Sequence, residues 1–575
     1  MADIATTNGH RITSPADLAS LQETLAVRAE GRRRVLVCST GCLAIGGREI
    51  EAAFRSEVAA AGLLNDVEVV KTGCHGLCAM APVAVFEPSD IIYGRNRIKY
   101  IPDVVSQTVA KGEIIRRFCY GRDAEMAHVE DIPFYAHQTK RVLRNVGRID
   151  PQKIEDAIER GVYAASAKAL TTMDPDEIIE EVKTAGLRGR GGGGFPAGLK
   201  WEICKNNPGN ARYLICNADE GDPGAFMDRA LLEGDPHAVL EGMIITAFAI
   251  GAAKGFIYVR AEYPIAVAHI RAAIDQAVDR GLLGTNILGS GFDLDIEVRE
   301  GAGAFVCGEE TAMIASLEGE RGMARPKPPY PALRGYMGEP TIINNVETFA
   351  NVPLIVNEGG AEFAESGTEG SKGTKIFALA GQVNNTGLVE VPMGATIRDI
   401  VFGVGGGMPR NREFKAVQMG GPSGGCVPAA HLDLPIDYDS LREVGAIMGS
   451  GGMVVMDNTT CIVDIARYFV AFCAEESCGL CAPCRLGTVQ LEEILNRICQ
   501  GQGRVEDLDR LEDLGAVVQQ TSLCGLGQTA PNPVLSTLRH FRDEYLAHVT
   551  DKTCPAGVCK ALLPVEVAAG KERRR

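Results

Sequence analysis

The chain has 575 residues, more than one compact core usually holds, and this length indicates roughly three to five domains. Its hydrophobic content of 46% is ordinary for a globular protein, and its formal net charge of -16 argues against nucleic-acid binding, which relies on a positive field. Its 18 cysteines and the lack of a charged and then apolar leader indicate a reducing compartment. We therefore expect a cytoplasmic protein whose thiolates hold metals rather than disulfides. The longest apolar stretch, 242–253, is shorter than the roughly 20 residues that span a bilayer, and predicts a buried core helix.

The first 115 residues alternate helix and strand signals. A polar extension over 1–30 contains one predicted helix, around 15–29. Residues 34–38 form a short apolar run typical of a buried strand, 50–61 carry apolar residues at helical spacing, and 67–70 indicate another strand. This order predicts a small α/β domain over 31–115, followed by a mixed-charge linker over 116–150.

Two pairs of cysteines follow these two strands. Cys38 and Cys42 form one C-x3-C pair, and Cys74 and Cys78 form the other. Loops at adjacent strand ends can bring four thiolates together, which suffices for a [2Fe-2S] cluster or a structural zinc ion. The residues alone leave both open; a resemblance to the thioredoxin-like ferredoxin domains that are fused to hydrogenase-type flavoprotein subunits implies the cluster. His75 is expected to be a supporting or solvent-exposed residue rather than a ligand.

A glycine-rich run over 189–194 satisfies the G-x-G-x-x-G pattern of dinucleotide-binding loops. In a Rossmann fold this pattern follows a strand, but here Asp174 and Pro175 open a predicted helix that Gly186 ends. The context therefore argues against a Rossmann site. A flexible linker is the alternative, but linkers are serine-rich and lack flanking residues such as Arg190. Open backbone N–H groups beside a cation favour a loop that cradles a phosphate or lies against a flat ring.

The sequence changes character after residue 372. Two strand signals, 375–381 and 387–391, flank an Asn-Asn-Thr-Gly turn and predict a small β-rich domain over 373–440. Helical spacing over 461–499 and 505–520 predicts a helical domain over 441–545.

This helical domain carries the most informative motif of the chain. Cys478, Cys481 and Cys484 are separated by two residues each, which brings three thiolates onto one short turn. The nearest following cysteine is Cys499, but we expect Cys524 to be the fourth ligand, because the glycines after it let the backbone wrap closely around an inorganic core. Zinc is the alternative, but its sites usually contain two separated pairs, so we predict a [4Fe-4S] cluster.

The tail over 546–575 holds only Cys554 and Cys559, so no complete cluster can form within it. We interpret it as vestigial, with a partner contact as the alternative. The remaining cysteines are interpreted as small buried hydrophobic residues. They are Cys119, Cys204, Cys216, Cys307, Cys426, Cys461, Cys473 and Cys499.

Five segments resemble, in family order, the NADH-binding flavoprotein subunit of respiratory complex I and its relatives in NAD-linked hydrogenases and formate dehydrogenases. The segments are 186–201, 216–226, 308–311, 327–330 and 343–348, and the cysteine triplet with Cys524 closes the series. The resemblance covers about residues 132–545. The Gly-Asp-Pro-Gly form at 221–224 is similar to the soluble branch rather than to complex I.

The resemblance implies that FMN and NAD(H) bind to this chain. For FMN it implies Gly189, Arg190, Gly191, Gly192, Lys200, Asn217, Asp219, Glu220, Tyr258, Asn344, Asn345 and Thr348. For NADH it implies Phe195, Asp222, Glu262, Lys327 and Tyr330.

General chemistry agrees with parts of this assignment. Aromatic rings hold flat heterocycles by stacking, and a carboxylate such as Glu262 accepts hydrogen bonds from a ribose diol but repels a 2'-phosphate. We therefore predict a preference for NAD(H) over NADP(H). On pattern alone, Tyr258 is a core aromatic residue, Lys327 is a surface lysine, and the acidic group from Asp219 to Asp222 is a solvated turn or a metal site.

The implied architecture is a multidomain α/β and α+β protein. It comprises a thioredoxin-like ferredoxin domain (31–115), a non-classical Rossmann-like FMN/NADH-binding α/β domain (151–372), a β-grasp-like domain (373–440) and a helical [4Fe-4S] domain (441–545). The tail is similar to the opening of a ferredoxin extension in the same relatives.

The implied function is that of an NADH dehydrogenase (diaphorase) flavoprotein subunit of a soluble multi-subunit oxidoreductase, which passes electrons between NAD(H) and iron-sulfur clusters through FMN. Its partners would be a small [2Fe-2S] subunit or a catalytic hydrogenase, formate dehydrogenase or oxidoreductase subunit, with neither nucleic acid nor membrane insertion. The alternatives are a subunit of the complex I peripheral arm and a non-catalytic iron-sulfur relay scaffold.

Overall fold

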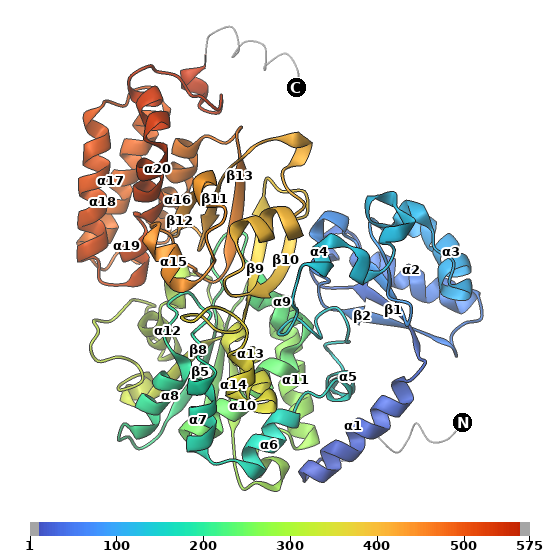
Figure 1. Ribbon diagram of the computed structural model, residues 1–575. Coiled ribbons are helices and arrows are strands. Elements are labelled where there is room, and N and C mark those ends of the chain that lie inside the picture. The colour runs from blue at the N-terminus through green and yellow to red at the C-terminus, as the bar shows by residue number, and fades with distance from the viewer. Residues whose placement is uncertain (1–10, 564–575) are drawn as a thin grey trace.

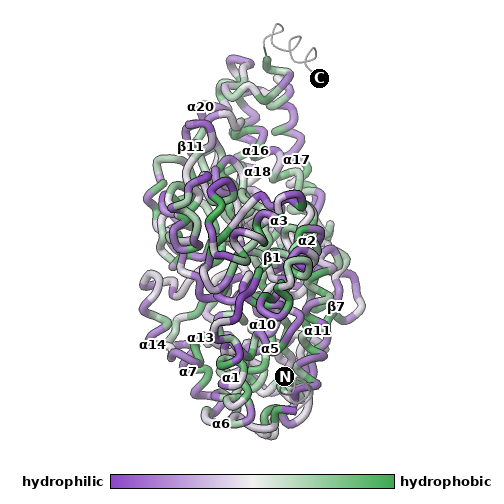
Figure 2. The backbone as a smooth tube through the Cα atoms, turned by 90° about the vertical axis from the view of Figure 1, so that its right-hand side faces the viewer, coloured by the Kyte–Doolittle hydropathy of each residue, from purple (hydrophilic) through white to green (hydrophobic). Residues whose placement is uncertain are grey.

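The computed structural model of the protein describes residues 11–563, which form three β-sheets and a C-terminal helical domain (Figure 1). The view turned by 90° shows an elongated molecule, with the C-terminal helices at one end and the N-terminal helix near the other (Figure 2). None of the helices within 11–563 combines the length and the apolar character that crossing a bilayer requires.

The N-terminal region follows the predicted order of elements. Helix α1 (Pro15–Ala29) begins at Ser14, whose hydroxyl caps it by accepting from the Asp17 amide. The first sheet has the order β2-β1-β3-β4, with β1 parallel to β2 and antiparallel to β3. Its strands are β1 (Arg33–Cys38), β2 (Val67–Thr72), β3 (Ala84–Glu87) and β4 (Ile91–Tyr93), and its helices are α2 (Gly47–Ala60) and α3 (Ile101–Val104). The helix and both strands predicted within 31–115 are confirmed.

The mixed-charge linker predicted over 116–150 packs closely against the parts of the molecule that it connects. Phe118, Cys119 and Ala127 pack into the core of the first domain. Further along, Phe134, in the single turn of α4 (Pro133–Ala136), packs into a second core that joins β1 and β3 of the first sheet to the β-rich domain. The segment therefore packs against both the N-terminal domain and the β-rich domain and holds the two together.

The second sheet is fully parallel and has the order β7-β6-β5-β8. Its strands are β5 (Tyr213–Ala218), β6 (Lys254–Arg260), β7 (Asp295–Gly301) and β8 (Thr341–Asn345). Around it lie α5 (Ile154–Glu159), α6 (Ala164–Thr172), α7 (Pro175–Thr184), α8 (Ala197–Asn206), α9 (Met227–Gly234), α10 (Pro236–Ile250), α11 (Pro264–Arg280), α12 (Glu310–Leu317), α13 (Val346–Glu358) and α14 (Gly360–Phe363). The apolar stretch 242–253 lies largely in α10, whose side chains are almost all buried, so the predicted core helix is confirmed.

The third sheet has the order β10-β9-β13-β11-β12. Its strands are β9 (Thr374–Gly381), β10 (Gly387–Pro392), β11 (Phe414–Met419), β12 (Gly425–Pro428) and β13 (Gly452–Asp457), and α15 (Tyr438–Glu443) lies between the last two. The predicted boundary at residue 440 is wrong, because β13 is the central strand of this sheet, parallel to β9 and antiparallel to β11. The misplacement has a simple cause, since strand β12, helix α15 and their loops separate β13 from β11, its nearest partner in sequence.

The C-terminal helices lie together at the end of the molecule, where all but the shortest of them pack around one core (Figure 1). They are α16 (Ile462–Glu475), α17 (Ala482–Cys499), α18 (Glu506–Thr521), α19 (Gly525–Thr529) and α20 (Asn532–Val549). Because α20 continues to Val549, the predicted domain end at 545 falls inside a helix and is wrong. Residues 550–563 then fold back on the bundle, while 564–575 lie outside the described residues.

Candidate functional site

The glycine run forms a loop between α7 and α8 and follows a helix, as predicted. A capping box formed by Asp174 and Glu177 starts α7. Gly192 and Gly194 have φ angles of 115° and 62°, which L side chains rarely adopt. A Cβ at Gly194 would also lie 2.6 Å from the Tyr438 ring, whereas one at Gly193 would have no atom within 4 Å. The loop therefore presents open backbone on one side and is tightly packed on the other.

Two contacts fix this loop, one to the β-rich domain and one to α13. The Tyr438 hydroxyl donates to the Gly189 carbonyl oxygen at 2.7 Å, and the Arg190 amide donates to Thr348 Oγ1 at 2.9 Å. The Arg190 side chain is fully buried and donates to the carbonyl oxygens of Lys372 at 2.6 Å and Arg188 at 3.2 Å. Arg190 thus braces the loop with two of its guanidinium nitrogens, while its buried Nε has no hydrogen-bond partner within residues 11–563.

An acidic group follows β5 at its carboxyl end. The Asp219 amide donates to Asn217 Oδ1 at 3.1 Å, and the Asn217 side chain donates to the Gly308 carbonyl oxygen at 2.9 Å. Glu220 accepts from the amides of Asp228 and Arg229, both at 3.1 Å, so it caps the N-terminus of α9. Burial raises the pKa of both Asp219 and Glu220 to about 7.

The two carboxylates differ in one decisive respect. Glu220 has two backbone donors, whereas both carboxylate oxygens of Asp219 are buried and have no hydrogen-bond partner within residues 11–563. Arg260 Nη1 is also buried and has no hydrogen-bond partner among these residues. It lies against Gly221 of the acidic group, only 2.8 Å from where a Cβ of that residue would be. Buried polar groups are nearly always hydrogen-bonded, so this pair indicates a ligand that supplies donors and acceptors here.

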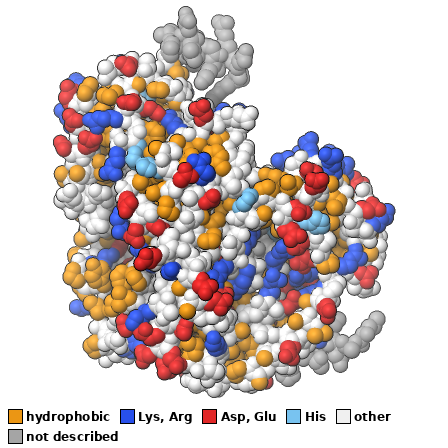
Figure 3. Space-filling view, viewed as in Figure 1, with side chains coloured by type: hydrophobic (Ala, Val, Ile, Leu, Met, Phe, Trp, Pro, Cys, Tyr) orange, Lys and Arg blue, Asp and Glu red, His pale blue; other side chains and the backbone are white. Residues whose placement is uncertain are grey.

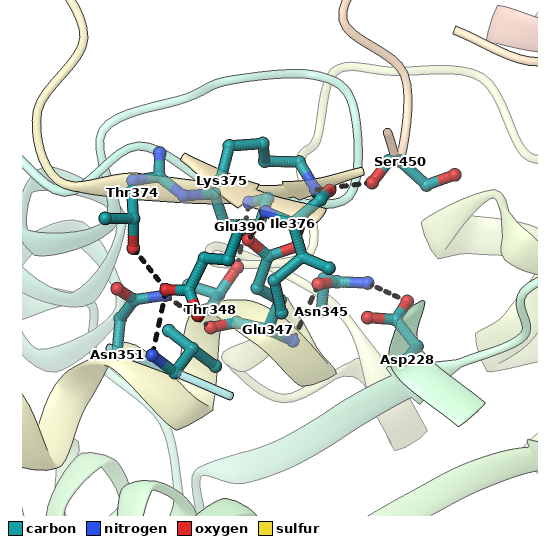
Figure 4. Close-up of polar contacts among 12 residues, drawn as sticks. Asp228, Asn345, Glu347, Thr348, Asn351, Thr374, Lys375, Ile376, Glu390 and Ser450 are labelled. Carbon is teal, nitrogen blue, oxygen red and sulfur yellow. Dashed lines mark hydrogen bonds and ion pairs between the residues drawn. The ribbon is translucent and has the colours of Figure 1, made fainter. Parts of the chain in front are cut away.

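The carboxyl end of β8 supplies the amide side chains. Asn344 Oδ1 accepts from the buried Trp201 indole at 2.9 Å. Asn345 caps α13 by accepting from the Glu347 amide at 2.9 Å, and it donates to Asp228 Oδ2 at 2.5 Å (Figure 4). The two asparagines therefore link β8 to α8 on one side and to α9 on the other.

Lys200 occupies the same region from α8. Its ammonium donates to the Ile343 carbonyl oxygen at 2.7 Å and pairs with Glu310. Burial alone would raise the pKa of Glu310, but Lys200 outweighs this effect and holds that pKa below its usual value. The lysine thus keeps a carboxylate charged at the start of α12.

The residues predicted for NADH lie at the exposed side of this region. Phe195 and Tyr330 are 51% and 57% exposed, so their rings are free for stacking. Lys327 Nζ pairs with Glu309 at 2.7 Å, and Arg260 approaches Glu262 at 3.3 Å. Exposed hydrophobic side chains gather over α8 and α12 at the lower left of the space-filling view (Figure 3), and Leu199 and Ile203 on α8 are among the exposed residues.

Two members of the predicted set are more enclosed. The Tyr258 hydroxyl shares a hydrogen bond with Ser316 at 2.9 Å, and the side chain is 2% exposed, which agrees with the alternative interpretation as a core aromatic residue. Asp222 accepts from the Ser450 hydroxyl at 2.8 Å, and burial raises its pKa to about 6. Asp222 therefore joins the parallel sheet domain to the loop before β13.

The chemistry of these residues fits FMN. Open loop backbone, together with Lys200, suits a phosphate. The unpartnered Asp219 carboxylate suits ligand hydroxyl groups, and Asn344 and Asn345 retain polar atoms that can meet a ring edge. The donor set thus matches a ligand that combines a phosphate, a polyol and a flat polar heterocycle.

The four predicted cluster cysteines surround one apolar cavity. It is lined by Cys478, Cys481, Cys484 and Cys524, together with Val306, Ala324, Ser477, Leu480, Leu523 and Leu526. Cys481 and Cys524 stand at the N-termini of α17 and α19. Burial raises the pKa of Cys484 to about 11. Such buried thiols need metal to become thiolates, and the cavity with four converging sulfurs suits a cubane cluster.

This cavity lies at the junction with the parallel sheet. Cys484, Cys524 and Leu526 belong to the same apolar core as Ile215 of β5 and Tyr258 of β6. Across the junction, the Phe305 amide donates to Glu476 at 3.0 Å, and the Phe305 and Phe472 rings meet edge to face at 5.3 Å. The cluster pocket and the candidate flavin pocket are therefore packed against each other.

The N-terminal cysteines converge at the ends of β1 and β2. Cys38 and Cys42 are buried, Cys74 is partly exposed, and Cys78 is exposed. A Cβ at Gly41, which precedes Cys42, would lie 3.4 Å from Cys74 Sγ, so the two pairs lie next to each other. Contact with Cys42 raises the pKa of Cys38 to about 12, and contact with Cys38 raises that of Cys74 to about 12. His75 is 7% exposed, and its Nε2 lies 3.3 Å from the Thr72 hydroxyl, so it is buried and not solvent-exposed.

The loop between Cys74 and Cys78 also docks onto the β-rich domain. The Cys78 amide donates to the Thr386 carbonyl oxygen at 3.0 Å, and the Leu388 amide donates to the Gly76 carbonyl oxygen at 2.9 Å. On its other side, a Cβ at Gly73 would lie 2.6 Å from Gly234, the last residue of α9. The cysteine loop thus rests against the far end of the helix that Glu220 caps.

Sequence reasoning missed several residues that shape the site. Tyr438 and Arg260 lie far in sequence from the loops that they contact, and no local pattern marks them. Glu347 lies within the segment 343–348 of the family resemblance, so its position could have been found there. The interpretation of Cys461, Cys554 and Cys559 also needs correction, because the structure brings these three buried thiols together with His548.

Comparisons with known proteins agree with the geometry. Residues 182–354 match the family described as the Nuo51 FMN-binding domain, and residues 464–548 match the NADH-ubiquinone oxidoreductase-F iron-sulfur binding region. The chain is 56% identical over 434 residues to the NADP-reducing hydrogenase subunit HndC of Solidesulfovibrio fructosivorans, covering 76% of this chain and 88% of that protein. It is 45% identical over 414 residues to an NADH-quinone oxidoreductase subunit of Rhizobium meliloti (strain 1021), covering 72% of this chain and 98% of that protein.

A solved structure extends the likeness to nearly the whole chain. A chain of an NAD+-reducing [NiFe]-hydrogenase in the H2-reduced state has a TM-score of 0.64 and 31% identity, covering 98% of this chain and 94% of that one. The protein therefore belongs to the family of NADH-oxidising flavoprotein subunits, dependent on FMN and iron-sulfur, that is found in complex I and in NAD-linked hydrogenases.

Proposed function

We propose that this chain is the NADH dehydrogenase (diaphorase) subunit of a soluble multi-subunit oxidoreductase. The observation that carries the proposal is the shared apolar core in which the four-cysteine cavity adjoins β5 and β6 of the candidate flavin domain. FMN, when bound, exchanges two electrons with nicotinamide and one at a time with iron-sulfur clusters. A cluster pocket packed against the flavin domain is the arrangement that this exchange needs.

The residues of the chain then have separate tasks. Lys200 and the open backbone of 189–194 hold the phosphate, and Asp219 accepts hydrogen bonds from ligand hydroxyls. Phe195 and Tyr330 supply exposed aromatic surfaces against which NADH stacks. No side chain is required to move a proton during hydride transfer, so the work of the protein is binding, orientation and the exclusion of water.

A second cluster is proposed for the N-terminal domain. We infer that 31–115 form a thioredoxin-like domain whose Cys38, Cys42, Cys74 and Cys78 hold a [2Fe-2S] cluster. The contacts among the two thiol pairs support this proposal, as does the position of the Cys74 loop against the end of α9. The eight residues of α9 span roughly 12 Å, at 1.5 Å per residue, between the region of Glu220 and this loop. A cluster held by this loop would therefore lie within reach of the flavin site.

The remaining finer assignments are proposals of the same kind. The five-stranded sheet with its loops is proposed to be β-grasp-like, and the partners are proposed to be a small [2Fe-2S] subunit or a catalytic hydrogenase, formate dehydrogenase or oxidoreductase subunit. A cytoplasmic location stays a prediction. Copurification of the natural complex identifies the partner that carries the substrate chemistry.

Sequence identity favours the hydrogenase type over the alternative, a complex I peripheral-arm subunit. The chain is 56% identical to the Solidesulfovibrio hydrogenase subunit and 45% identical to the Rhizobium NADH-quinone oxidoreductase subunit, over alignments of 434 and 414 residues. The chain of the solved hydrogenase structure also matches 98% of this chain and is itself covered over 94%.

A direct experiment separates this function from a non-catalytic iron-sulfur scaffold. Full-length protein is reconstituted with FMN and iron-sulfur under anaerobic conditions, and reduction of an artificial dye by NADH is measured. We expect stoichiometric flavin and dye reduction that depends on NADH. Protein that keeps its iron but binds no flavin would be a scaffold.

A further inference from the structure

Four potential metal ligands meet at the C-terminal end of the molecule, away from the flavin pocket and the two cluster sites. They are Cys461, His548, Cys554 and Cys559, all buried, and their ligand atoms all lie within 4.8 Å of one another. Within residues 11–563, no other group of three or more His, Cys, Asp or Glu residues brings its ligand atoms this close together. The four cluster cysteines around Cys484 are not this close together, because thiolates that bind different irons of a cubane must stand further apart.

The distances in this group match a single tetrahedral ion. The sulfurs of Cys461 and Cys559 are 3.7 Å apart, and His548 Nε2 lies 3.4 Å from the first and 3.5 Å from the second. With Zn–S and Zn–N bonds of about 2.3 and 2.05 Å, tetrahedral angles place two sulfurs about 3.8 Å apart and sulfur and nitrogen about 3.6 Å apart. The side chains therefore already stand where zinc would need them.

The surrounding hydrogen bonds orient the ligands. His548 Nδ1 lies 2.7 Å from the Glu544 carbonyl oxygen, which can only accept, so Nδ1 carries the hydrogen and Nε2 directs its lone pair at the thiols. Backbone amides point at the sulfurs: those of Val558 and Cys559 donate to Cys554 at 3.3 and 3.5 Å, and that of Asp464 donates to Cys461 at 3.5 Å. Amides that donate to sulfur stabilise thiolates, the form that binds metal.

We propose that Cys461, His548, Cys554 and Cys559 bind a structural zinc ion that anchors the C-terminal segment 550–563 to the helical domain. The ligands come from the start of α16, the last turn of α20 and the segment itself, so the ion joins three parts of the chain. All four positions are filled by protein, which is the mark of a structural rather than a catalytic zinc site. Zinc has no redox chemistry in proteins, so the ion takes no part in electron transfer.

Metal analysis of the full-length protein tests the proposal. Protein purified anaerobically is expected to contain about one zinc ion per chain besides its iron. His548→Ala and Cys559→Ala are expected to lose the zinc while keeping the iron and the visible spectrum of the Cys478 cluster. Cys426→Ala serves as the control, because Cys426 is a buried thiol on β12 outside both groups, and it is expected to keep zinc and iron.

A second measurement does not depend on the folding of any variant. Zinc is removed from the wild-type protein with a chelator, and Co²⁺ is added in its place. The d–d spectrum of tetrahedral cobalt with thiolate ligands is expected, and protease cleavage near residue 550 is expected to rise in the zinc-free protein and to fall again with metal.

Three results would overturn the proposal. One is wild-type protein without zinc that shows no cobalt spectrum. Another is the loss of about four irons in Cys559→Ala, which would mean a cluster at this site. The third is a Cys461–Cys559 disulfide found in the freshly isolated protein by mass spectrometry, since it would consume two of the ligands.

Discussion

Lys375 and Glu347 form an ion pair at 2.6 Å with side-chain exposures of 0% and 1% (Figure 4). The second carboxylate oxygen of Glu347 accepts from the Ile376 amide at 2.9 Å, and Lys375 also donates to the carbonyl oxygens of Ile376 at 2.7 Å and Ser450 at 2.5 Å. The pair joins β9 of the five-stranded sheet to the first turn of α13, which carries Thr348 and follows Asn345. Through this contact the β-rich domain supports the candidate flavin site.

Removing one partner of this pair is expected to destabilise the junction. Lys375→Met leaves the Glu347 carboxylate buried and unpaired, which costs about 3–5 kcal/mol of unfolding free energy. We expect an earlier urea transition and a lower FMN content. Arg398→Met is the control, because the Arg398–Asp433 pair is 51% and 74% exposed and such a pair contributes at most about 1 kcal/mol. Equal losses in the two variants would contradict the proposed role of the buried pair.

The affinity for FMN is expected to rise with pH through the titration of Asp219. Burial raises the pKa of this carboxyl from 3.8 to about 7, so the flavin-free protein holds the proton at pH values at which the unfolded chain has lost it. The stability of the flavin-free protein therefore falls as pH rises from about 4 to 7. Ligand hydroxyls that donate to the carboxylate relieve this loss, so binding tightens over the same window, by at most about tenfold per pH unit.

Fluorescence titration with FMN between pH 5 and 8 measures this dependence. The FMN phosphate also titrates, near a pKa of about 6, so the wild-type curve contains both effects. Asp219→Asn keeps the phosphate contribution and removes that of the carboxyl. We expect weaker binding at pH 8 and a shallower pH dependence in this variant, and an unchanged slope would mean that Asp219 does not face the flavin.

Cys524 rather than Cys499 is expected to complete the [4Fe-4S] cluster. Cys524 lines the cavity with the other three ligands, whereas Cys499 is 15 residues after Cys484 along α17, which places it roughly 22 Å away at 1.5 Å per residue. Cys524→Ala is expected to lose about four irons per chain and to keep its flavin. Cys499→Ala is the matched control and is expected to keep the full iron content. Iron loss in the control alone would reverse the assignment.

The parts of this architecture that sequence could predict are those set by local patterns. Helix α7 was predicted from Asp174 and Pro175, and the cluster ligands from the two-residue spacing of the triplet. Strand β13 was missed because its place at the centre of a sheet depends on pairing with β9, far away in the sequence. The group formed by Cys461, His548, Cys554 and Cys559 was missed for the same reason. These residues are brought together only when α20 packs against α16.

Arg190 illustrates a different limit. Its position beside the glycine run predicted a ligand contact, and the residue is indeed in the loop. Its side chain, however, is fully buried and donates to the carbonyl oxygens of Arg188 and Lys372. The motif predicts that an arginine is needed at this position. It does not predict whether the guanidinium contacts the ligand or hydrogen-bonds to the backbone that supports the loop.

Glu262 is expected to set the preference between NADH and NADPH. Its side chain is 50% exposed, lies beside Gly303 and approaches Arg260 at 3.3 Å. A carboxylate here accepts from a ribose diol and repels a 2'-phosphate, so the wild-type protein should favour NADH. Glu262→Gln is expected to raise the ratio of kcat/KM for NADPH to that for NADH by about tenfold, which corresponds to about 1.4 kcal/mol. The relative named an NADP-reducing hydrogenase subunit makes this ratio the informative measurement.

The matched control for this prediction is Glu300→Gln. Glu300 lies near the carboxyl end of β7, is 43% exposed and pairs with Arg271, so it offers a similar carboxylate that is held by a different arginine. Its ratio of NADPH to NADH turnover is expected to equal that of the wild-type protein. If both variants leave the ratio unchanged, Glu262 is not the discriminating residue. If both raise it equally, the effect comes from the overall negative field of this face rather than from contact with the ribose.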